Sequence, residues 1–309
     1  MAFDSFQAIS IFVKVAETRS FTKAARRLGM SPSGVSKVLA RLEERLGVRL
    51  MNRTTRNVSL TADGDAFFER CRQILSELED AESAVTGRVT RLQGRFRIQT
   101  PVAFGRKIVI PMLAQFVKAN KGLVVDMELS DRAPDLAEEG LDAVVRIGEV
   151  QSTSVVVRKL CNLRYVTVAS PDYLAQYGEP MTPDDLQRHS CLAYYVPHTN
   201  RYRDWHFDVE GQHLSKAISG ALNINSADGL LDAALAGAGI ATISTFIAAD
   251  AVKSGQLRIV LRRYICDGPA ISIVYQSRRH LSARVRAFVD YLTAQMSPAP
   301  PWDAIIENY

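Results

Sequence analysis

The stretch AARRLGMSPSGVSKVLARLEERLG, residues Ala24–Gly47, contains the signals that determine how the first part of the chain folds. Two alanines precede Gly29, and glycine tolerates the positive φ that ends many helices. Ser31 is a favourable N-cap, and Pro32 fits the first helical position because the N–H that proline lacks would be unpaired there. The stretch therefore predicts a helix, a short turn and a second helix.

The second predicted helix has one apolar and one polar face. Its apolar positions recur at helical spacing, and they are Val35, Val38, Leu39, Leu42 and Leu46. The other faces carry Ser33, Ser36, Lys37, Ala40 and Arg41. A short, polar and basic helix end fits the DNA major groove, and the second helix of a helix-turn-helix reads bases with its first residues.

The flanking segments complete a small domain. A helical stripe begins at Phe6, and Ser20 can cap the helix that follows it. After the second helix, Val48 and Leu50, then Val58 and Leu60, predict the two arms of a hairpin. Its tip, RTTR, includes Arg53, Thr54 and Arg56, and arginines on such a loop suit the negative minor groove. The alternative is two solvated turn arginines.

Charge separates the chain into a basic and a near-neutral part. Residues 1–60 hold eleven basic and four acidic residues, and the remainder holds 27 basic and 29 acidic residues. A basic module predicts a polyanionic partner, although a solvated helical surface would give the same count.

The block SFTKAARRLGMSPSGVSKVLARLEERLGVRLMNRTTRNVSLTADG resembles the winged helix-turn-helix of LysR-type transcriptional regulators. Arg19 departs from the glycine that the family often has before Ser-Phe-Thr. The resemblance implies that Pro32, Ser33, Ser36 and Lys37 face DNA and that Arg53 and Arg56 serve the wing. The predicted DNA-binding set is Ser31, Pro32, Ser33, Ser36, Lys37, Arg41, Arg53, Thr54 and Arg56.

A long amphipathic helix is expected after Thr61. Its small or apolar positions follow a heptad-like alternation, and they are Phe67, Cys71, Ile74, Leu78, Ala81 and Val85. We expect a second copy of the helix to cover this seam, which gives a homodimer, and the resemblance implies the same. The alternative is packing on the first helix of the same chain.

From about residue 91, predicted strands and helices alternate, which favours a largely parallel α/β sheet. The resemblance implies a domain like a periplasmic binding protein, with two subdomains and a ligand between them. It is closest to a branch with TPVAFGR, LSDR, VRIGE and SRRHLS, which are found here at Thr100–Arg106, Leu129–Arg132, Val145–Glu149 and Ser277–Ser282.

These features predict the following organisation. Residues 1–60 form the winged helix-turn-helix, 61–90 the linker and dimerisation helix, 91–297 the effector-binding domain, and 298–309 a tail. Within the effector-binding domain, the resemblance implies a first subdomain at 91–161 with 269–297, and a second at 162–268.

The effector pocket is expected beyond the carboxyl ends of the strands, where helix N-termini favour an anion. Arg146 could pair with a carboxylate or form an internal ion pair with Asp131 or Asp142. An aromatic wall could come from Tyr194, Tyr195, Tyr202 and Trp205, although tyrosines at this spacing can also be structural. The predicted effector contacts are Thr100, Pro101, Phe104, Ser130, Asp131, Arg146, Gly148, Tyr194, Asn225 and Ser226.

Other patterns exclude several classes of protein. The histidines lack metal-binding spacing, Gly237-Ala238-Gly239 follows a helix instead of a strand, and G-x-S-x-G does not occur, so we expect no metal, no cofactor and no enzyme. Dispersed cysteines and the lack of a secretory or membrane-spanning pattern predict a cytoplasmic protein that does not contact a membrane. Prolines after Met296 predict a flexible tail, although Trp302, Ile305 and Ile306 could dock on a neighbouring surface.

The expected function is sequence-specific DNA binding by a dimeric or tetrameric transcriptional regulator that a small molecule controls. Double-stranded DNA with a two-fold site and a small effector, such as an organic anion, are the expected partners, and RNA polymerase is a further candidate. A competing class is a solute-binding or carrier protein whose basic amino-terminal region only dimerises. Specific retardation of promoter DNA separates the two.

Overall fold

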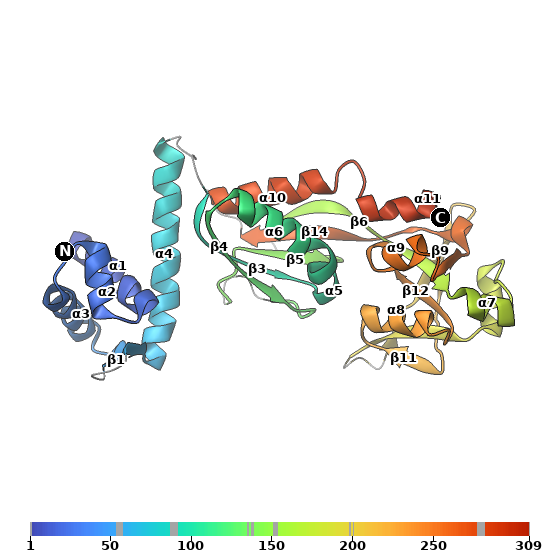
Figure 1. The fold of residues 1–309 in the computed structure, drawn as a ribbon, viewed down its shortest axis with the longest axis horizontal. Coiled ribbons are helices and arrows are strands. Elements are labelled where there is room, and N and C mark those ends of the chain that lie inside the picture. Colours follow the sequence, from blue (N-terminus) through green and yellow to red (C-terminus); the bar gives the residue numbers. More distant parts are fainter. Residues whose placement is uncertain are drawn as a thin grey trace. The chain divides into compact units, whose positions relative to one another are not determined.

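The computed structural model describes residues 2–53, 58–86, 92–134, 136, 139–150, 154–197, 199, 201–276 and 282–308. The chain divides into two compact units, Met1–Gly94 and Arg95–Tyr309 (Figure 1).

The first unit begins with three helices, continues with a hairpin and ends in a long helix. Ser20 Oγ accepts a hydrogen bond from Lys23 N, and Ser31 Oγ accepts one from Gly34 N, so both predicted N-caps are confirmed. Gly29 ends the second helix with φ 65°, as expected. The elements are α1 (Ala2–Thr18), α2 (Phe21–Leu28), α3 (Pro32–Leu46), β1 (Met51–Arg53), β2 (Val58–Leu60) and α4 (Ala62–Thr86).

The core of this unit lies between α1, α2, α3 and the start of α4. Phe12, Val35 and Leu39 are fully buried in it, and Ala24 and Ala25 allow the close approach of α2. The hairpin differs from the expectation at one arm. Its first strand begins at Met51, which pairs with Leu60, and Val48 is exposed outside the strand.

The second unit contains a mixed sheet rather than the largely parallel one that the sequence suggests. Two long strands, β6 (Val155–Ala169) and β14 (Asp267–Gln276), pair antiparallel with each other and run between the two halves of the unit (Figure 1). The described strand order is β11 (Leu222–Ile224), β7 (Cys191–Val196), β12 (Ile240–Ser244), β6, β14, β5 (Ala143–Ile147), β3 (Gln93–Thr100) and β4 (Gly122–Leu129). Two shorter strands lie off this path: β13 (Arg258–Val260) pairs with β6, and β8 (Arg201–Tyr202) pairs with β7. Parallel pairing occurs in β3–β5, β7–β11 and β7–β12, so each half retains a parallel segment.

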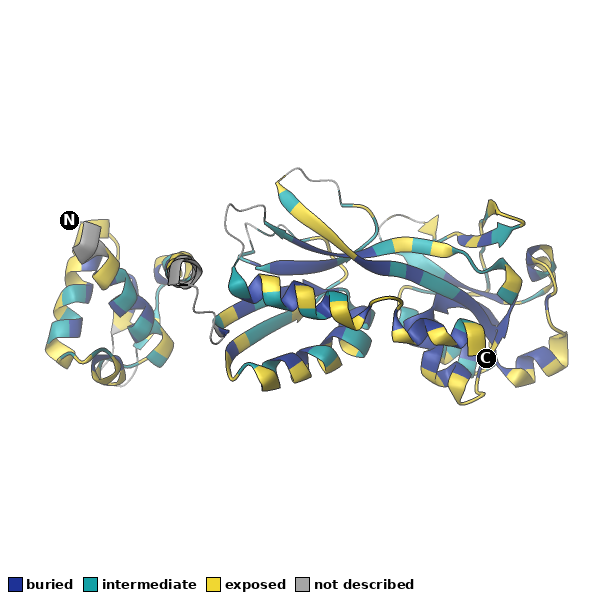
Figure 2. Cartoon of the chain, turned by 90° about the horizontal axis from the view of Figure 1, so that it is seen from above, coloured by how far each residue is buried: buried dark blue, intermediate teal, exposed yellow. Residues whose placement is uncertain are grey.

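Burial differs among the strands, since β12 is buried at every position, and helices cover the faces of the sheet (Figure 2). Figure 2 shows that these helices are buried on one side and exposed on the other. The strands β9 (Trp205–Val209) and β10 (Gln212–Lys216) form a separate antiparallel pair. The helical segments are α5 (Val102–Phe104), the π-helical η1 (Gly105–Val109), α6 (Ile110–Ala119), α7 (Pro171–Tyr177), η2 (Pro183–Arg188), α8 (Ala227–Leu235), α9 (Thr245–Lys253), η3 (Arg262–Tyr264) and α10 (Ala283–Gln295).

The carboxyl-terminal segment is folded, so the expectation of a flexible tail is wrong for its described residues. It forms a 3₁₀ turn, η4 (Pro301–Ala304), and α11 (Ile305–Asn308), both packed against α9. Trp302 and Ile305 are buried, which is the docked alternative. Asp303 is buried as well and accepts a hydrogen bond of 2.6 Å from Thr245 Oγ1. The prolines end α10, but apolar burial of the residues beyond them outweighs the entropy of a free tail.

Across the parts of the chain that the structure describes, none of the helices combines the length and the apolar character needed to span a membrane.

Candidate DNA-binding and effector sites

The amino-terminal end of α3 presents polar and basic side chains at the surface. Pro32, Ser33, Lys37 and Arg41 are exposed and Ser36 is half-buried, while the opposite face of α3 is buried in the core. Ser31, the N-cap, is also exposed, and its Oγ lies 3.1 Å from Ser33 Oγ. This end of the helix can therefore enter a groove without exposing apolar side chains.

The hairpin is anchored to α3 by a residue that sequence reasoning missed. Glu43 Oε1 accepts hydrogen bonds from the backbone N–H groups of Leu50 (2.9 Å) and Met51 (3.1 Å). Glu43 is polar, so the spacing of apolar residues does not reveal that its carboxylate accepts two backbone hydrogen bonds. Arg53 ends β1, but its side chain, Thr54 and Arg56 lie outside the described residues, so the predicted wing contacts are not placed.

The predicted dimerisation seam divides into two parts. Phe67 and Cys71 pack on the core of their own unit: the Phe12 and Phe67 ring centroids are 5.4 Å apart, and Cys71 is 1% exposed. Burial raises the pKa of the Cys71 thiol to about 11. Both residues thus pack within their own unit, as in the internal packing alternative; Cys71 is fully buried there, whereas Phe67 is half-buried.

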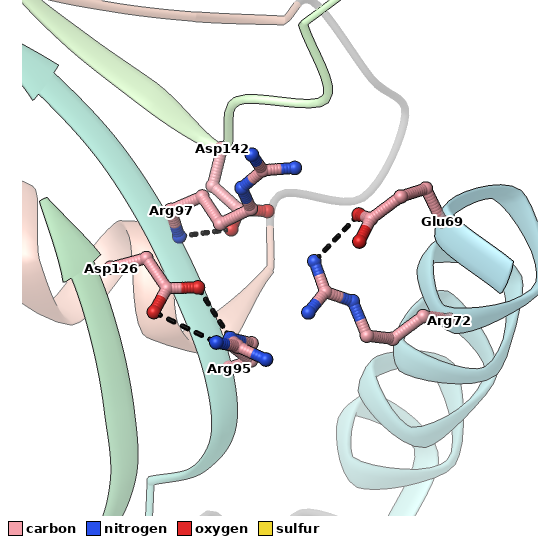
Figure 3. A network of polar contacts seen from close by, with 6 residues as sticks. All are labelled: Glu69, Arg72, Arg95, Arg97, Asp126 and Asp142. Atoms are coloured by element: carbon pink, nitrogen blue, oxygen red, sulfur yellow. Dashed lines mark hydrogen bonds and ion pairs between the residues drawn. The ribbon is translucent and has the colours of Figure 1, made fainter. Parts of the chain in front are cut away.

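Farther along α4, Ile74 is 52% and Leu78 39% exposed. The side chains of Ala81 and Val85 lie outside the described residues. Arg72 and Glu69 form an ion pair of 2.8 Å along the same helix (Figure 3). The exposed part of the seam is therefore shorter than predicted and starts at Ile74.

A cavity of about 230 Å³ lies in the second unit, between its two halves. The first half contributes the segment after β3 and Asp131, and the second contributes β7, the start of α8 and the start of α9. Six predicted effector contacts line it: Pro101, Phe104, Asp131, Tyr194, Asn225 and Ser226.

Arg203 is the main side chain of this cavity that sequence reasoning missed. Its guanidinium carbon lies 4.7 Å from the ring centroid of Tyr165 and 4.6 Å from that of Tyr194, so the two rings hold it between them. It also donates to Tyr165 Oη (3.4 Å) and to the carbonyl of Thr242 (3.3 Å). A single arginine in an irregular loop gives no sequence signal, because its position depends on contacts far along the chain.

The electrostatics of the cavity combine one cation with nearby negative charge. Burial raises the pKa of Tyr194, and the charge of Asp131 raises it further, while Arg203 lowers it. Asp131 also accepts a hydrogen bond of 3.0 Å from Val102 N, which fixes its carboxylate at the rim of the first half. The cavity can therefore pair an acidic group with Arg203 and a hydrogen-bond donor with Asp131.

Four predicted effector residues do not line the cavity. Thr100 is fully buried, Ser130 Oγ accepts from Arg132 N, and Gly148, with φ 99°, donates to the carbonyl of Ala270. Arg146 lies on β5 opposite Ser272 of β14. Their sequence neighbours Pro101, Asp131 and Ile147 do line the cavity, so the strand ends reach it while these four residues do not.

The predicted alternative for Arg146, an internal ion pair, is not found among the described residues. Asp131 binds Val102 N, and Asp142 accepts from the backbone N–H of Arg97 at 2.8 Å (Figure 3). Figure 3 also shows Arg95 paired with Asp126 on the neighbouring strand.

Two ion pairs connect the halves of the second unit near the cavity. Arg106 Nη1 lies 3.1 Å from Asp228 Oδ2, and Lys107 Nζ lies 3.8 Å from Asp250 Oδ2. Both pairs are largely solvent-exposed, so each contributes little free energy.

Within the described ranges, no group of three or more histidine, cysteine or acidic residues could hold a metal ion. The cysteines described are free thiols.

The geometry defines a class of protein: a helix-turn-helix module joined to an α/β domain with a ligand-sized cavity between its halves. Comparison with known proteins agrees. Residues 6–65 match the family model described as "Bacterial regulatory helix-turn-helix protein, lysR family", and residues 90–297 match "LysR substrate binding domain". The chain belongs to the LysR family of transcriptional regulators.

Similar proteins span the whole length of the chain. The uncharacterized HTH-type transcriptional regulator YhjC of Escherichia coli (strain K12) is 34% identical, covering 95% of this chain and 98% of that protein. The HTH-type transcriptional activator AaeR of the same organism is 33% identical over 94% of this chain and 93% of its own length. The solved structure of CrgA, a LysR-type regulator from Neisseria meningitidis, has a TM-score of 0.61 and 30% identity, covering 94% of this chain and 98% of CrgA.

The protein is thus a DNA-binding transcriptional regulator with an effector-binding domain, as the sequence predicts, and the family consists of regulators, not enzymes.

Proposed function

We propose that this regulator binds a two-fold DNA site as a homodimer or a dimer of dimers, and that a compact organic anion in the cavity controls it. The exposed polar end of α3, with Ser33 and Lys37, supports its insertion into the major groove. Ser31, Pro32, Ser36 and Arg41 complete the proposed contacts of this helix, and Arg53, Thr54 and Arg56 those of the wing.

The exposed apolar part of α4 supports dimerisation. Ile74 and Leu78 are four residues apart and therefore lie on one face of the helix. Large apolar side chains on an exposed helix face are stabilised by a partner helix. Two-fold pairing places two α3 helices about 34 Å apart, or a multiple of this, to match successive major grooves.

Arg203 is the observation that supports an anionic effector. A guanidinium held between two rings loses little entropy when it binds a carboxylate, and its remaining N–H groups can form a bidentate pair. A cavity of about 230 Å³ suits a ligand of modest size, because roughly 150 Å³ accommodates benzene. Pro101, Phe104, Asn225 and Ser226 would surround the rest of the ligand.

The control mechanism is a shift between two arrangements of the halves. A ligand that contacts Asp131 in one half and Arg203 in the other stabilises the arrangement in which both contacts form. The change reaches DNA through the spacing of the paired α3 helices, and transcription responds through altered occupancy or contact with RNA polymerase.

The ligand proposal is tested by thermal unfolding of the full-length protein with millimolar benzoate, cyclohexanecarboxylate and hexanoate, each beside its neutral amide. We expect at least one carboxylate to raise the melting temperature while its amide does not, because only the anion pairs with Arg203. Arg203→Gln should abolish the shift, and Arg203→Lys should reduce it. A shift that persists unchanged in Arg203→Gln, or that amides match, contradicts the assignment.

A further inference from the structure

Arg19 occupies a strained backbone position between α1 and α2. Its φ is 47°, in the left-handed region that side chains other than glycine rarely adopt. The turn around it is fixed, since Thr18 Oγ1 donates to the carbonyls of Lys14 (2.8 Å) and Ser20 (3.0 Å). Glycine would occupy this position without steric cost.

The hydrogen bonds of Thr18 hold the backbone, but no contact of the Arg19 side chain in the described part of the chain offsets the strain. The Arg19 side chain is exposed, and it forms no hydrogen bond or ion pair with a described residue. The nearest acidic side chain in sequence, Glu17, is paired with Lys14 at 2.7 Å. A strained, exposed side chain without such a partner indicates a role outside the folded monomer.

The surroundings of Arg19 identify the partner. Arg19 comes directly before Ser20, the N-cap of α2, and α2 is the first helix of the helix-turn-helix. In this arrangement the first helix crosses the DNA backbone. The outer face of α2 carries Lys23, Arg26 and Arg27, all exposed, and α2 has no acidic residue in its first turn.

We propose that Arg19 binds a DNA phosphate beside the start of α2 and thereby fixes how the recognition helix enters the groove. The guanidinium fork matches two phosphate oxygens, and a phosphate contact positions the protein without reading sequence. This inference rests on DNA binding by the first unit, and it adds a contact outside α3 and the wing.

The test compares wild type with Arg19→Gly, Arg19→Asn and Arg19→Lys. The affinity of each protein is measured for two DNA duplexes, one of about 30 base pairs with an unrelated sequence and one from the region upstream of the gene. Each measurement is repeated between about 50 and 200 mM KCl. Arg19→Gly should melt at a higher temperature than wild type, because the strain is released, yet bind both duplexes more weakly. The slope of log K against log salt should fall by about 0.9 for each phosphate that the variant no longer neutralises. The ratio of wild-type affinity to Arg19→Gly affinity should therefore fall by about threefold per phosphate between the lowest and the highest salt concentration.

The other variants separate charge from backbone strain. Arg19→Asn tolerates the left-handed backbone and should show the same reduced slope, whereas Arg19→Lys should keep the wild-type slope. Glu210→Gly is the matched control, because Glu210 has φ 53° in the second unit, and it should gain stability without a loss of DNA affinity.

An Arg19→Gly protein that binds both duplexes with wild-type affinity and slope overturns the proposal, whatever its melting temperature. That outcome would leave DNA binding by the first unit intact. A wild-type protein that binds neither duplex would overturn DNA binding itself, together with the role of Arg19.

Discussion

In the DNA-binding unit, single residues determine where two backbone segments can approach each other closely. Gly64, in the first turn of α4, is one such residue. A Cβ atom built there would lie 1.8 Å from the carbonyl oxygen of Leu50 and 2.7 Å from its carbonyl carbon. The same carbonyl accepts a hydrogen bond of 3.0 Å from Thr61 N, so α4 and the hairpin are locked together at backbone distance.

Gly64→Ala should therefore lower the free energy of unfolding by about 3 kcal/mol, because the overlap is with backbone that cannot rotate away. Urea unfolding of the full-length protein, followed by circular dichroism, measures this. Ala66→Gly, at an exposed position of the same helix, is the control and should cost about 1 kcal/mol of helix propensity. If both substitutions lower the free energy of unfolding equally, the backbone around Gly64 can move to accommodate a side chain.

Residues with local roles are predictable from sequence, and residues with distant partners are not. Ser20, Ser31 and Gly29 act on their own helix ends, so capping preference is enough to place them. Arg203 acts through Tyr165, on a strand 38 positions away in sequence. No periodic pattern reports such contacts, and for the same reason the sequence predicts Arg146 in the cavity although it lies beside β14.

At the scale of elements, α4 combines internal packing with an exposed seam. Its first half belongs to the core through Phe67 and Cys71, and its second half exposes Ile74 and Leu78. The heptad spacing predicts both halves as one dimer surface, since periodicity records that a face is apolar but not what covers it.

If the proposed homodimer pairs through α4, Ile74→Glu should dissociate it to monomers, because a charge buried in the helix seam without a partner is costly to desolvate. Sedimentation velocity at micromolar protein concentration measures the change. Met181→Glu, which replaces another apolar side chain at 62% exposure, should leave the sedimentation coefficient unchanged. A fully dimeric Ile74→Glu protein would rule out this part of α4 as the interface.

The docked carboxyl-terminal segment contains a carboxylate that is costly to ionise. Burial raises the pKa of Asp303, while its hydrogen bond from Thr245 and the charge of Arg164 partly oppose the shift. Because the folded pKa exceeds the ordinary value of 3.8, the folded protein binds the proton more tightly than the unfolded chain does. This contribution to stability is complete below pH 3.8 and is lost as the pH rises through the folded pKa.

Asp303→Asn retains an oxygen acceptor for Thr245 and removes the titration. Its free energy of unfolding relative to wild type should therefore increase as the pH rises above 3.8 and become constant above the folded pKa. Urea unfolding over a pH series measures the difference. A difference that stays constant across the series would show that Asp303 titrates normally in the folded protein.

The segment also explains why the sequence pattern alone is misleading at this end of the chain. Trp302 packs edge-to-face on Phe104 and Phe246, with ring centroids 6.0 and 6.3 Å away. Phe104 and Phe246 in turn line the effector cavity. Prolines and small residues indicate a free tail, and only the folded sheet brings these aromatic partners together.

At the level of the whole molecule, we propose that two copies of α3, one from each subunit of a dimer, enter successive grooves of one operator. In this proposal the basic first unit binds DNA and the near-neutral second unit binds the effector. This division follows from composition and spacing, and the family assignment supports it.

Footprinting on the DNA upstream of the gene measures this paired insertion. It compares wild type with Ser33→Asp and with the control Lys118→Ala, which alters an exposed residue of α6. Wild type and Lys118→Ala should protect two half-sites whose centres are about 10 base pairs, or a multiple, apart. Ser33→Asp should abolish protection of both half-sites together, because its charge meets the floor of each groove. Protection by Ser33→Asp that equals wild type, or a single protected site without two-fold symmetry, would contradict the account.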